Sequence, residues 1–234
     1  SKRGNTHLIT AIDGFTKFIF MKPVTSTKTG PAIYFLRGII ETFGVPRRLV
    51  CDRGSCFTSK TFTEFCTTCG IKVVLNATAT PRANKQMERY NRTIISSVAC
   101  STDEESCWDK TISQIQFGLN NTINRTTGKS PYELLLGYRP KGWSDAYLLN
   151  DLDLKENVSD LASVRRQAAE QTAQHQDAQK KRYDLRRRSP TQYKIGQYVL
   201  MRKTIASNNE KGKKALPNYS GSYVVTKSYL TTGT

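Results

Sequence analysis

Two carboxylates, Asp52 and Glu88, stand where they could hold a metal ion. Asp52 closes the run RRLVCD, which predicts a short strand, and Glu88 lies in the first turns of a predicted helix, with 35 residues between them. A carboxylate at the end of a strand can face one on a neighbouring helix, and hard cations such as Mg²⁺ and Mn²⁺ prefer oxygen ligands. The pair suggests divalent-metal chemistry, although Asp is common in turns and a helical Glu is usually solvated.

Six cysteines and two histidines offer another possible metal site. Cys66 and Cys69 have the spacing of two zinc ligands. A structural zinc site needs four ligands, however, and no second pair has a matching spacing. We therefore prefer the interpretation that these are reduced thiols packed along a helix in an intracellular protein.

The chain is strongly basic, with 36 Lys and Arg against 19 Asp and Glu, a net charge of +17 and a pI near 9.8. Such a charge attracts a polyanion, and nucleic acid is the commonest one. No apolar run approaches the length of about 18 residues that spans a membrane, so we expect no membrane partner. Residues 1–5 contain no start Met and precede no apolar segment, which indicates an internal boundary of a longer chain instead of a signal peptide.

The first 142 residues should form one α/β domain that positions both carboxylates. Two β-rich runs, separated by the hairpin-like pair Gly14-Phe15, are followed by alternating helices and strands. This order predicts a sheet of mixed direction flanked by helices. The expected strands are residues 7–13, 16–24, 47–52 and 71–75, and the expected helices are residues 28–43, 59–69, 85–100 and a later one that carries Trp108 and Leu119.

The composition changes after Trp143. Residues 158–182 are rich in Gln, Ala and charge, which predicts a polar linker helix with a basic end. Residues 193–203 and 219–230 alternate like strands around a Lys-rich loop, which suggests a small β-barrel whose last strands are missing. We therefore divide the chain into a core (1–142), a linker helix (143–190) and a partial C-terminal DNA-binding domain (191–234).

Short motifs along nearly the whole chain point to one family. They are GNTH (4–7), IDGFTKF (12–18), the Asp52 segment, ATATPRAN (77–84), ERYNR (88–92), LNNT (119–122) and SPYELL (130–135). These motifs closely resemble the integrases of gypsy-class long-terminal-repeat retrotransposons, relatives of retroviral integrases. The resemblance implies a fragment of a Pol polyprotein, with a ribonuclease-H-like core and an incomplete SH3-like domain. Residues 221–223 (GSY) stand where that domain commonly has Gly-Pro-Tyr.

By this resemblance, Asp52 and Glu88 are the second and third members of the family's Asp, Asp, 35 residues, Glu triad. The family places its first Asp on the opening strand of a three-stranded antiparallel unit, whereas only two strands precede the first helix here. The resemblance therefore implies that segment 1–5 corresponds to the turn after a lost opening strand. Asp13 occupies a position that the family does not use catalytically. It is the less favoured catalytic candidate, and its expected role is turn chemistry before Gly14.

Lys85 is a departure from the family pattern, which usually has Gly before Gln86. A Gly there lets a mobile loop enter the helix without a side chain, so Lys85 would stiffen the loop or add a phosphate contact. The zinc module that precedes the core in the family is also absent from the chain, as expected of an N-terminal truncation.

The resemblance implies processing of a DNA 3′ end and strand transfer into host DNA. Two metal ions would activate water or a 3′-hydroxyl for in-line attack and stabilise the leaving oxygen, with no covalent protein intermediate. The expected setting is a homodimer or tetramer on the element's DNA ends and target DNA, within a nuclear complex that is cytoplasmic before import. The residues expected to contact DNA are Asn84, Lys85, Gln86, Arg89, Arg92, Lys180, Lys181, Arg182, Arg186, Arg187, Arg188, Arg202, Lys203, Lys213 and Lys214.

Three questions stay open at this point: whether the chain is an active enzyme, whether its basic C-terminal residues bind DNA, and what Asn91 and Arg92 do. A catalytically inactive, decayed or host-adopted integrase would bind DNA or assemble without the chemistry. The missing first Asp favours that alternative for this chain, whereas Asp52 and Glu88 at the family separation favour an enzyme as the parent. The basic residues near the C-terminus could also form only a solvated loop, and Asn91 and Arg92 could either support the site or pack.

Overall fold

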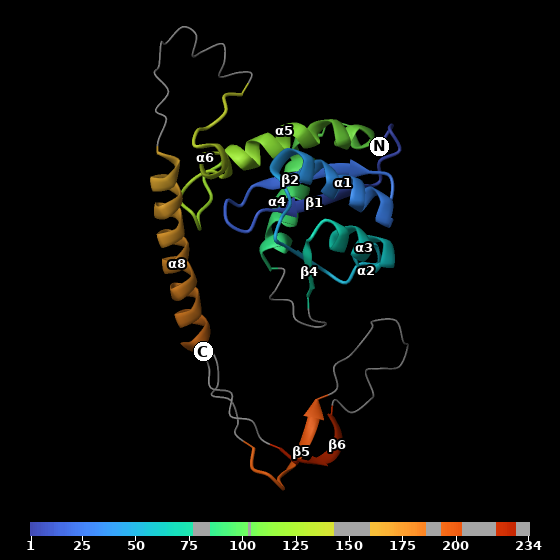
Figure 1. The fold of residues 1–234 in the computed structure, drawn as a ribbon, viewed down its shortest axis with the longest axis vertical. Helices are drawn as coiled ribbons and strands as arrows, with labels where there is room; N and C mark the ends of the chain where they lie inside the picture. Colours follow the sequence, from blue (N-terminus) through green and yellow to red (C-terminus); the bar gives the residue numbers. More distant parts are fainter. Residues whose placement is uncertain (77–84, 103, 143–159, 186–192, 203–218, 228–234) are drawn as a thin grey trace. The chain divides into compact units, whose positions relative to one another are not determined.

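The computed structural model describes residues 1–76, 85–102, 104–142, 160–185, 193–202 and 219–227 (Figure 1). The chain forms two compact units, Ser1–Ala178 and Gln179–Thr234. The divisions that we expected after residues 142 and 190 border on or lie in segments outside the described residues, and they stay a prediction. None of the helices in the described segments is long and apolar enough to cross a membrane.

An antiparallel hairpin opens the first unit. Its strands are β1 (His7–Ile12) and β2 (Ile19–Val24), paired in register from His7 with Val24 to Ile12 with Ile19. The hairpin predicted around Gly14-Phe15 is therefore confirmed. Alternation along β2 turns Ile19 and Met21 towards one core, where they pack with Ile94, Ile112 and Ile115.

A parallel strand pair with its helices forms the second part of this unit. The elements are α1 (Thr29–Phe43), β3 (Arg48–Cys51), α2 (Ser55–Thr58), α3 (Lys60–Thr68) and β4 (Lys72–Leu75). Ser59 caps α3 by accepting the N–H of Phe62, and Gly70 follows with a φ of 71° that favours glycine. A core of Ala32, Leu36, Cys51, Phe62, Cys66 and Ile71 joins these elements.

The expected mixed sheet is present as two separate strand pairs among the described residues. β1 pairs only with β2, and β3 pairs only with β4. Ile9 of β1 nevertheless packs against the core that holds β3 and β4, so the two pairs belong to one folded body. Strands of both directions, with helices around them, give the α/β class that the sequence predicts.

Three helical segments follow the strand pairs: α4 (Lys85–Ser101), the short η1 (Glu105–Cys107) and α5 (Trp108–Asn121). α5 also covers the outer edge of β2 with two amide side chains. The Asn120 amide accepts the N–H of Ile19 at 2.8 Å and donates to its carbonyl at 2.9 Å, and Gln116 accepts the N–H of Met21 at 2.6 Å. The backbone groups of this strand edge are thus satisfied without a further strand.

A short helix, α6 (Pro131–Leu136), was not among the predicted elements. Ser130 and Glu133 form a reciprocal capping box at its start, Pro131 occupies its first turn, and Gly137 ends it in the left-handed conformation. All of these are sequence-readable signals of a helix. α2 and η1 were also missed, because each is too short to show a hydrophobic period.

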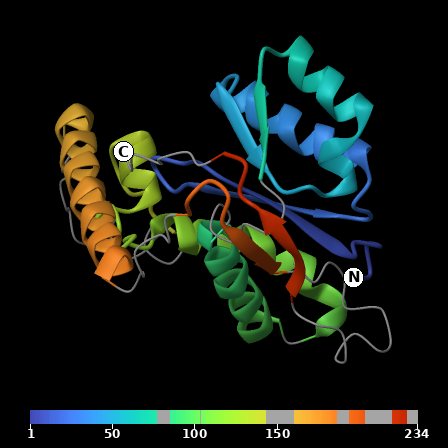
Figure 2. The same ribbon diagram turned by 90° about the horizontal axis from the view of Figure 1, so that it is seen from below.

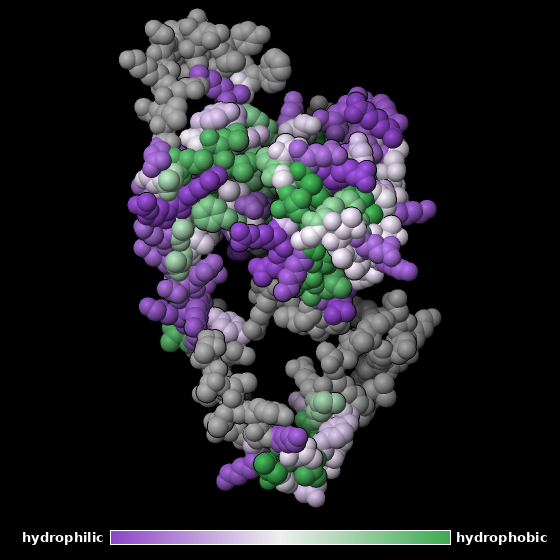
Figure 3. All heavy atoms as spheres, viewed as in Figure 1, coloured by the Kyte–Doolittle hydropathy of each residue, from purple (hydrophilic) through white to green (hydrophobic). Residues whose placement is uncertain are grey.

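A polar helix lies where the sequence predicts one, as α8 (Leu161–Leu185), and its role as a linker stays a prediction. Only Val164 and Ala168 are buried in it, and they pack against Leu134 of α6. Figures 1 and 2 both show α8 alongside α6, and Figure 3 shows hydrophilic residues along much of α8. This apolar contact holds the first half of the otherwise polar helix on α6. Arg165 adds to it, because its guanidinium donates to the carbonyls of Leu134 and Leu135 at 2.9 and 3.2 Å.

The second unit contains the antiparallel strands β5 (Tyr198–Arg202) and β6 (Tyr219–Val224), with an irregular register between Val199 and Met201. Both strands lie within the runs that we expected to be β. The Lys-rich loop between them lies outside the described residues, and the SH3-like barrel stays a prediction.

Candidate metal and DNA site

Asp52 is held at the carboxyl end of β3 by a tight local loop. Its Oδ1 accepts the N–H of Gly54 at 2.9 Å, and its side chain is exposed. A Cβ added to Gly54 would lie 3.0 Å from that oxygen, so a larger residue there would crowd the carboxylate. The loop therefore orients Asp52 with its backbone while leaving the carboxylate accessible to an ion.

The loop after β4 is tied to the Asp52 loop. The N–H of Asn76 donates to the Cys51 carbonyl at 2.9 Å, and Nε of Arg53 donates to the Asn76 carbonyl at 3.0 Å. These two bonds continue the β3–β4 pairing beyond its last strand residues. Residues 77–84, which lead from here to α4, lie outside the described residues.

Glu88 lies in the first turn of α4, and its side chain is exposed. The residues that flank it anchor the helix. The Thr10 hydroxyl of β1 contacts Met87 Sδ at 3.7 Å and Asn91 Oδ1 at 3.4 Å. The hydroxyl of Tyr90 accepts a hydrogen bond from the Asn124 amide, and burial raises the pKa of Tyr90. Neighbours thus fix the helix while Glu88 remains in solvent.

β1 is the element that connects the two carboxylates. Its Ile9 packs against the core that holds β3, and its Thr10 touches α4. Within the described segments, no group of three or more His, Cys, Asp or Glu side chains is placed to hold a metal. Our expectation that Asp52 and Glu88 share a metal stays a prediction.

Asp13 has the turn role that the sequence favours for it. Its Oδ2 accepts the N–H of Phe15 at 3.2 Å and both the N–H and the hydroxyl of Thr16 at 2.7 Å. Thr16 is itself buried. These bonds close the β1–β2 turn through one oxygen of the carboxylate.

The cysteines at the core are free thiols. Cys66 is fully buried in the α1–α3 core, where Cys69 packs against it, as expected of thiols along a helix. Burial raises the pKa of Cys51, directly before Asp52, to about 11. A thiol in this state is a small apolar residue rather than a nucleophile or a ligand.

The residues predicted to contact DNA lie on α4, on α8, at the end of β5 and outside the described residues. Arg89 and Arg92 are exposed on α4 near Glu88, and Lys180, Lys181 and Arg182 are exposed on the last turns of α8. Lys85 and Gln86 begin α4, and Arg202 ends β5. Asn84, Arg186, Arg187, Arg188, Lys203, Lys213 and Lys214 lie outside the described residues.

The positioning contacts of Thr10, Tyr90 and Asn124 were not found by sequence reasoning. Each joins residues that lie 34 to 81 positions apart in the chain. No local pattern signals such a pair, although Tyr90 and Asn91 do fall inside the ERYNR motif.

Comparisons with known proteins find similarity to an integrase domain and to transposon polyproteins. Residues 1–81 match the family model described as integrase core domain. The Tf2-3 and Tf2-4 transposon polyproteins of Schizosaccharomyces pombe are each 26% identical to the chain over 237 residues, covering 96% of it. The chain spans 17% of the length of these polyproteins.

Among solved structures, the chain is similar to an intasome of simian T-cell lymphotropic virus in complex with PP2A regulatory subunit B56 gamma. The identity is 19%, the TM-score 0.49, and the match covers 58% of this chain and 51% of that one. The catalytic core domain of BIV integrase has 19% identity and a TM-score of 0.47, over 56% of this chain and 90% of that one. Residues 1–81 of the chain thus match the integrase core domain model, and nearly the whole chain is similar to a segment of transposon polyproteins.

Proposed function

We propose that the chain is the integrase part of a gypsy-class retrotransposon polyprotein, whose parent protein trims DNA 3′ ends and joins them to target DNA. The observation that carries the proposal is the pair of exposed carboxylates, Asp52 at the end of β3 and Glu88 in the first turn of α4. They are separated by 35 residues in a chain whose first 81 residues match the integrase core domain.

Asp52 and Glu88 would hold Mg²⁺ or Mn²⁺, because both are accessible oxygen donors of the type that these cations prefer. The ions would activate the attacking oxygen and stabilise the leaving one. On the protein side, the Gly54 N–H orients Asp52, while Thr10 and Tyr90 fix the helix that carries Glu88. Arg89 and Arg92 lie on the same helix and would contact the phosphates of the DNA end.

The second unit and the assembly on DNA complete the proposed function. The two strands of the second unit would belong to an SH3-like domain, and α8 would be the linker to it. DNA ends and target DNA would be bound by a homo-oligomer in a nuclear complex. By the family resemblance, a third carboxylate would come from an opening strand beside β1.

A second candidate function is DNA binding by an inactive integrase relative. The specific observation in its favour is Asp13, whose Oδ2 is engaged by the β1–β2 turn, the role expected of a structural Asp. The two candidates share the DNA partner and differ in the chemistry.

The test is strand transfer and metal binding by residues 1–234. We expect the chain to bind duplex DNA but not to join strands in Mg²⁺, because two carboxylates hold two metals poorly. We expect the chain to bind Mn²⁺ weakly, with an affinity measured by titration calorimetry. This affinity should fall at least about tenfold in both Asp52→Asn and Glu88→Gln, which corresponds to about 1.4 kcal/mol. A Glu41→Gln variant, which changes an exposed helical carboxylate elsewhere, is the control.

Robust Mg²⁺-dependent strand transfer would overturn the expectation of inactivity and restore Asp13 as a candidate. Equal Mn²⁺ binding by all three variants would remove Asp52 and Glu88 from the metal site. A crystal structure with the two carboxylates more than about 10 Å apart would do the same, since the metals of a two-metal centre lie only about 4 Å apart.

A further inference from the structure

One face of the β3–β4 pair is directed away from the α1–α3 core. Alternate residues of the two strands pack into that core: Leu49, Cys51, Val73 and Leu75. Because side chains alternate between the faces of a strand, the residues between them lie on the other face. There, Arg48 and Lys72 are exposed, and Val50 is 49% exposed. This face is a solvent-accessible surface of the first unit.

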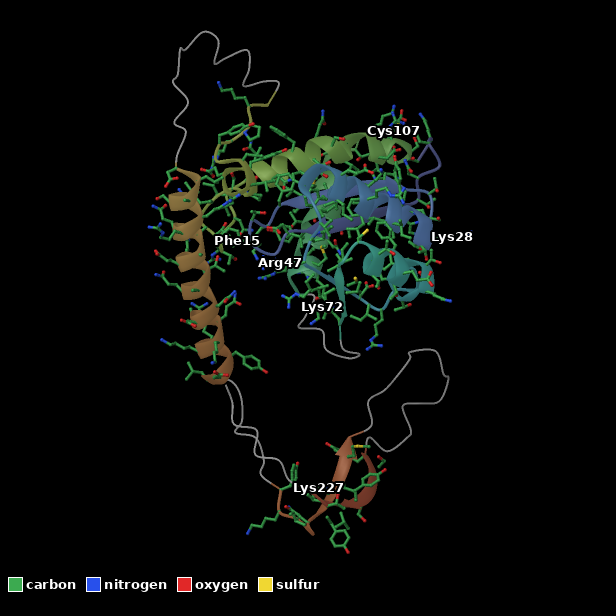
Figure 4. All side chains as sticks on the ribbon, viewed as in Figure 1. Phe15, Lys28, Arg47, Lys72, Cys107 and Lys227 are labelled. Carbon is green, nitrogen blue, oxygen red and sulfur yellow. The ribbon has the colours of Figure 1, made fainter. Side chains whose placement is uncertain are left out.

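Two cations lie at the beginning of this face. Arg48 and Lys72 are direct partners in the parallel register. The N–H of Lys72 also donates to the carbonyl of Arg47 at 3.2 Å, at the end of the strand pair where Figure 4 labels Arg47 and Lys72. In the described part of the chain, no ion pair or hydrogen bond holds the side chain of Arg48 or of Lys72. Like charges directly opposite each other destabilise a strand pair. The arrangement is therefore unfavourable until an anion lies across it.

The same face leads to Asp52. Arg48 and Val50 are exposed and alternate with Leu49 and buried Cys51, and exposed Asp52 continues this alternation. Asp52 is four positions beyond Arg48, a distance of about 13 Å along an extended chain. In duplex DNA that distance corresponds to about four base pairs along the axis. A duplex with one phosphate held near Asp52 through the divalent cation proposed there would thus reach Arg48 and Lys72 with its own backbone.

We propose that Arg48 and Lys72 form a phosphate-binding pair for duplex DNA, about four base pairs from the proposed metal-binding end of β3. The identity of the ligand rests on the proposed function, whereas the pair itself rests on the sheet face. The contacts are electrostatic and made to the DNA backbone, so they carry affinity and position without base preference.

The test is a salt titration of binding to a random-sequence duplex by the whole chain, with EDTA present to remove metal chemistry. In Arg48→Gln/Lys72→Gln, the slope of log affinity against log salt should become shallower by about 1.8, because each lost phosphate contact removes about 0.9. Lys2→Gln/Lys60→Gln removes the same charge from two exposed lysines that are paired with Glu104 and Glu64, and its slope should hardly change.

A charge-conserving swap, Arg48→Lys/Lys72→Arg, separates charge from folding and should keep the wild-type slope. The proposal is refuted if Arg48→Gln/Lys72→Gln keeps the full slope while the affinity of the wild-type chain for DNA depends strongly on salt. Equal flattening in both double variants would refute it too, since that result reports net charge alone. Stronger binding of single-stranded RNA than of the duplex would overturn the choice of partner. If the wild-type chain does not bind DNA, the proposed function itself fails.

Discussion

Asn120 shows how much one side chain can contribute to this fold. It is fully buried, and it satisfies both backbone groups of Ile19 on the outer edge of β2. Asn120→Ala would leave a buried donor and a buried acceptor without partners. We expect a loss of stability on the order of 3 kcal/mol, measured by urea unfolding.

The neighbouring substitution Asn121→Ala is the control for that measurement. Asn121 makes one hydrogen bond, to the Pro140 carbonyl, and its buried oxygen has no hydrogen-bond partner. Its loss should therefore cost much less. Equal destabilisation by the two variants would show that Asn120 does not act through the strand edge.

Cys51 should give the protein a stability that depends on alkaline pH. Burial raises its pKa to about 11, above the ordinary value of 9.0, so the folded state favours the neutral thiol. The contribution is complete below pH 9 and is lost as the pH rises from 9 towards 11, where the unfolded chain releases the proton first. Urea unfolding at pH 8 and pH 10.5 should show a smaller drop for Cys51→Ala than for the wild type. An identical loss of stability in the two proteins would show that Cys51 does not cause the alkaline pH dependence.

At the scale of elements, the sequence predicted the long pieces and missed the short ones. α1, α4, α5 and α8 each carry a period or composition that can be read over several turns. α6 has only six residues and was overlooked despite its capping box. The two carboxylates could be chosen by spacing and motif, but the packing of Thr10 and Tyr90 around Glu88 depends on contacts between distant segments. Such contacts have no signature in a single sequence.

The capping box of α6 makes this short helix a support for α8. Ser130 is fully buried and accepts the N–H of Glu133, while Leu134 of the same helix packs against α8. Ser130→Ala should destabilise the first unit by about 1 kcal/mol, observed as a lower urea midpoint. Ser96→Ala, on the exposed surface of α4, should change stability by only a few tenths of a kcal/mol. An unchanged urea midpoint in Ser130→Ala would show that α6 does not need its cap.

Over the whole molecule, the positive charge is concentrated in the second unit. Residues 179–234 contain 13 Lys and Arg but 2 Asp and Glu, a net charge of +11 out of +17. Deletion of residues 180–234 should therefore weaken duplex binding and flatten its salt dependence, since each phosphate contact contributes about 0.9 to the slope. Glu88→Gln should leave both quantities nearly unchanged. A deletion that keeps the full slope would mean that the basic C-terminal residues form only a solvated surface.

The apolar contact of α8 has a rotational consequence within the first unit. Val164 and Ala168 are four residues apart, and both pack against Leu134 of α6. At about 100° per residue, these two positions share one face of the helix. One residue inserted between them would turn Ala168 by about a quarter of a revolution away from Leu134, whereas an insertion after Ala168 would leave this contact unchanged. The contact between α8 and α6 therefore depends on the spacing of these two residues.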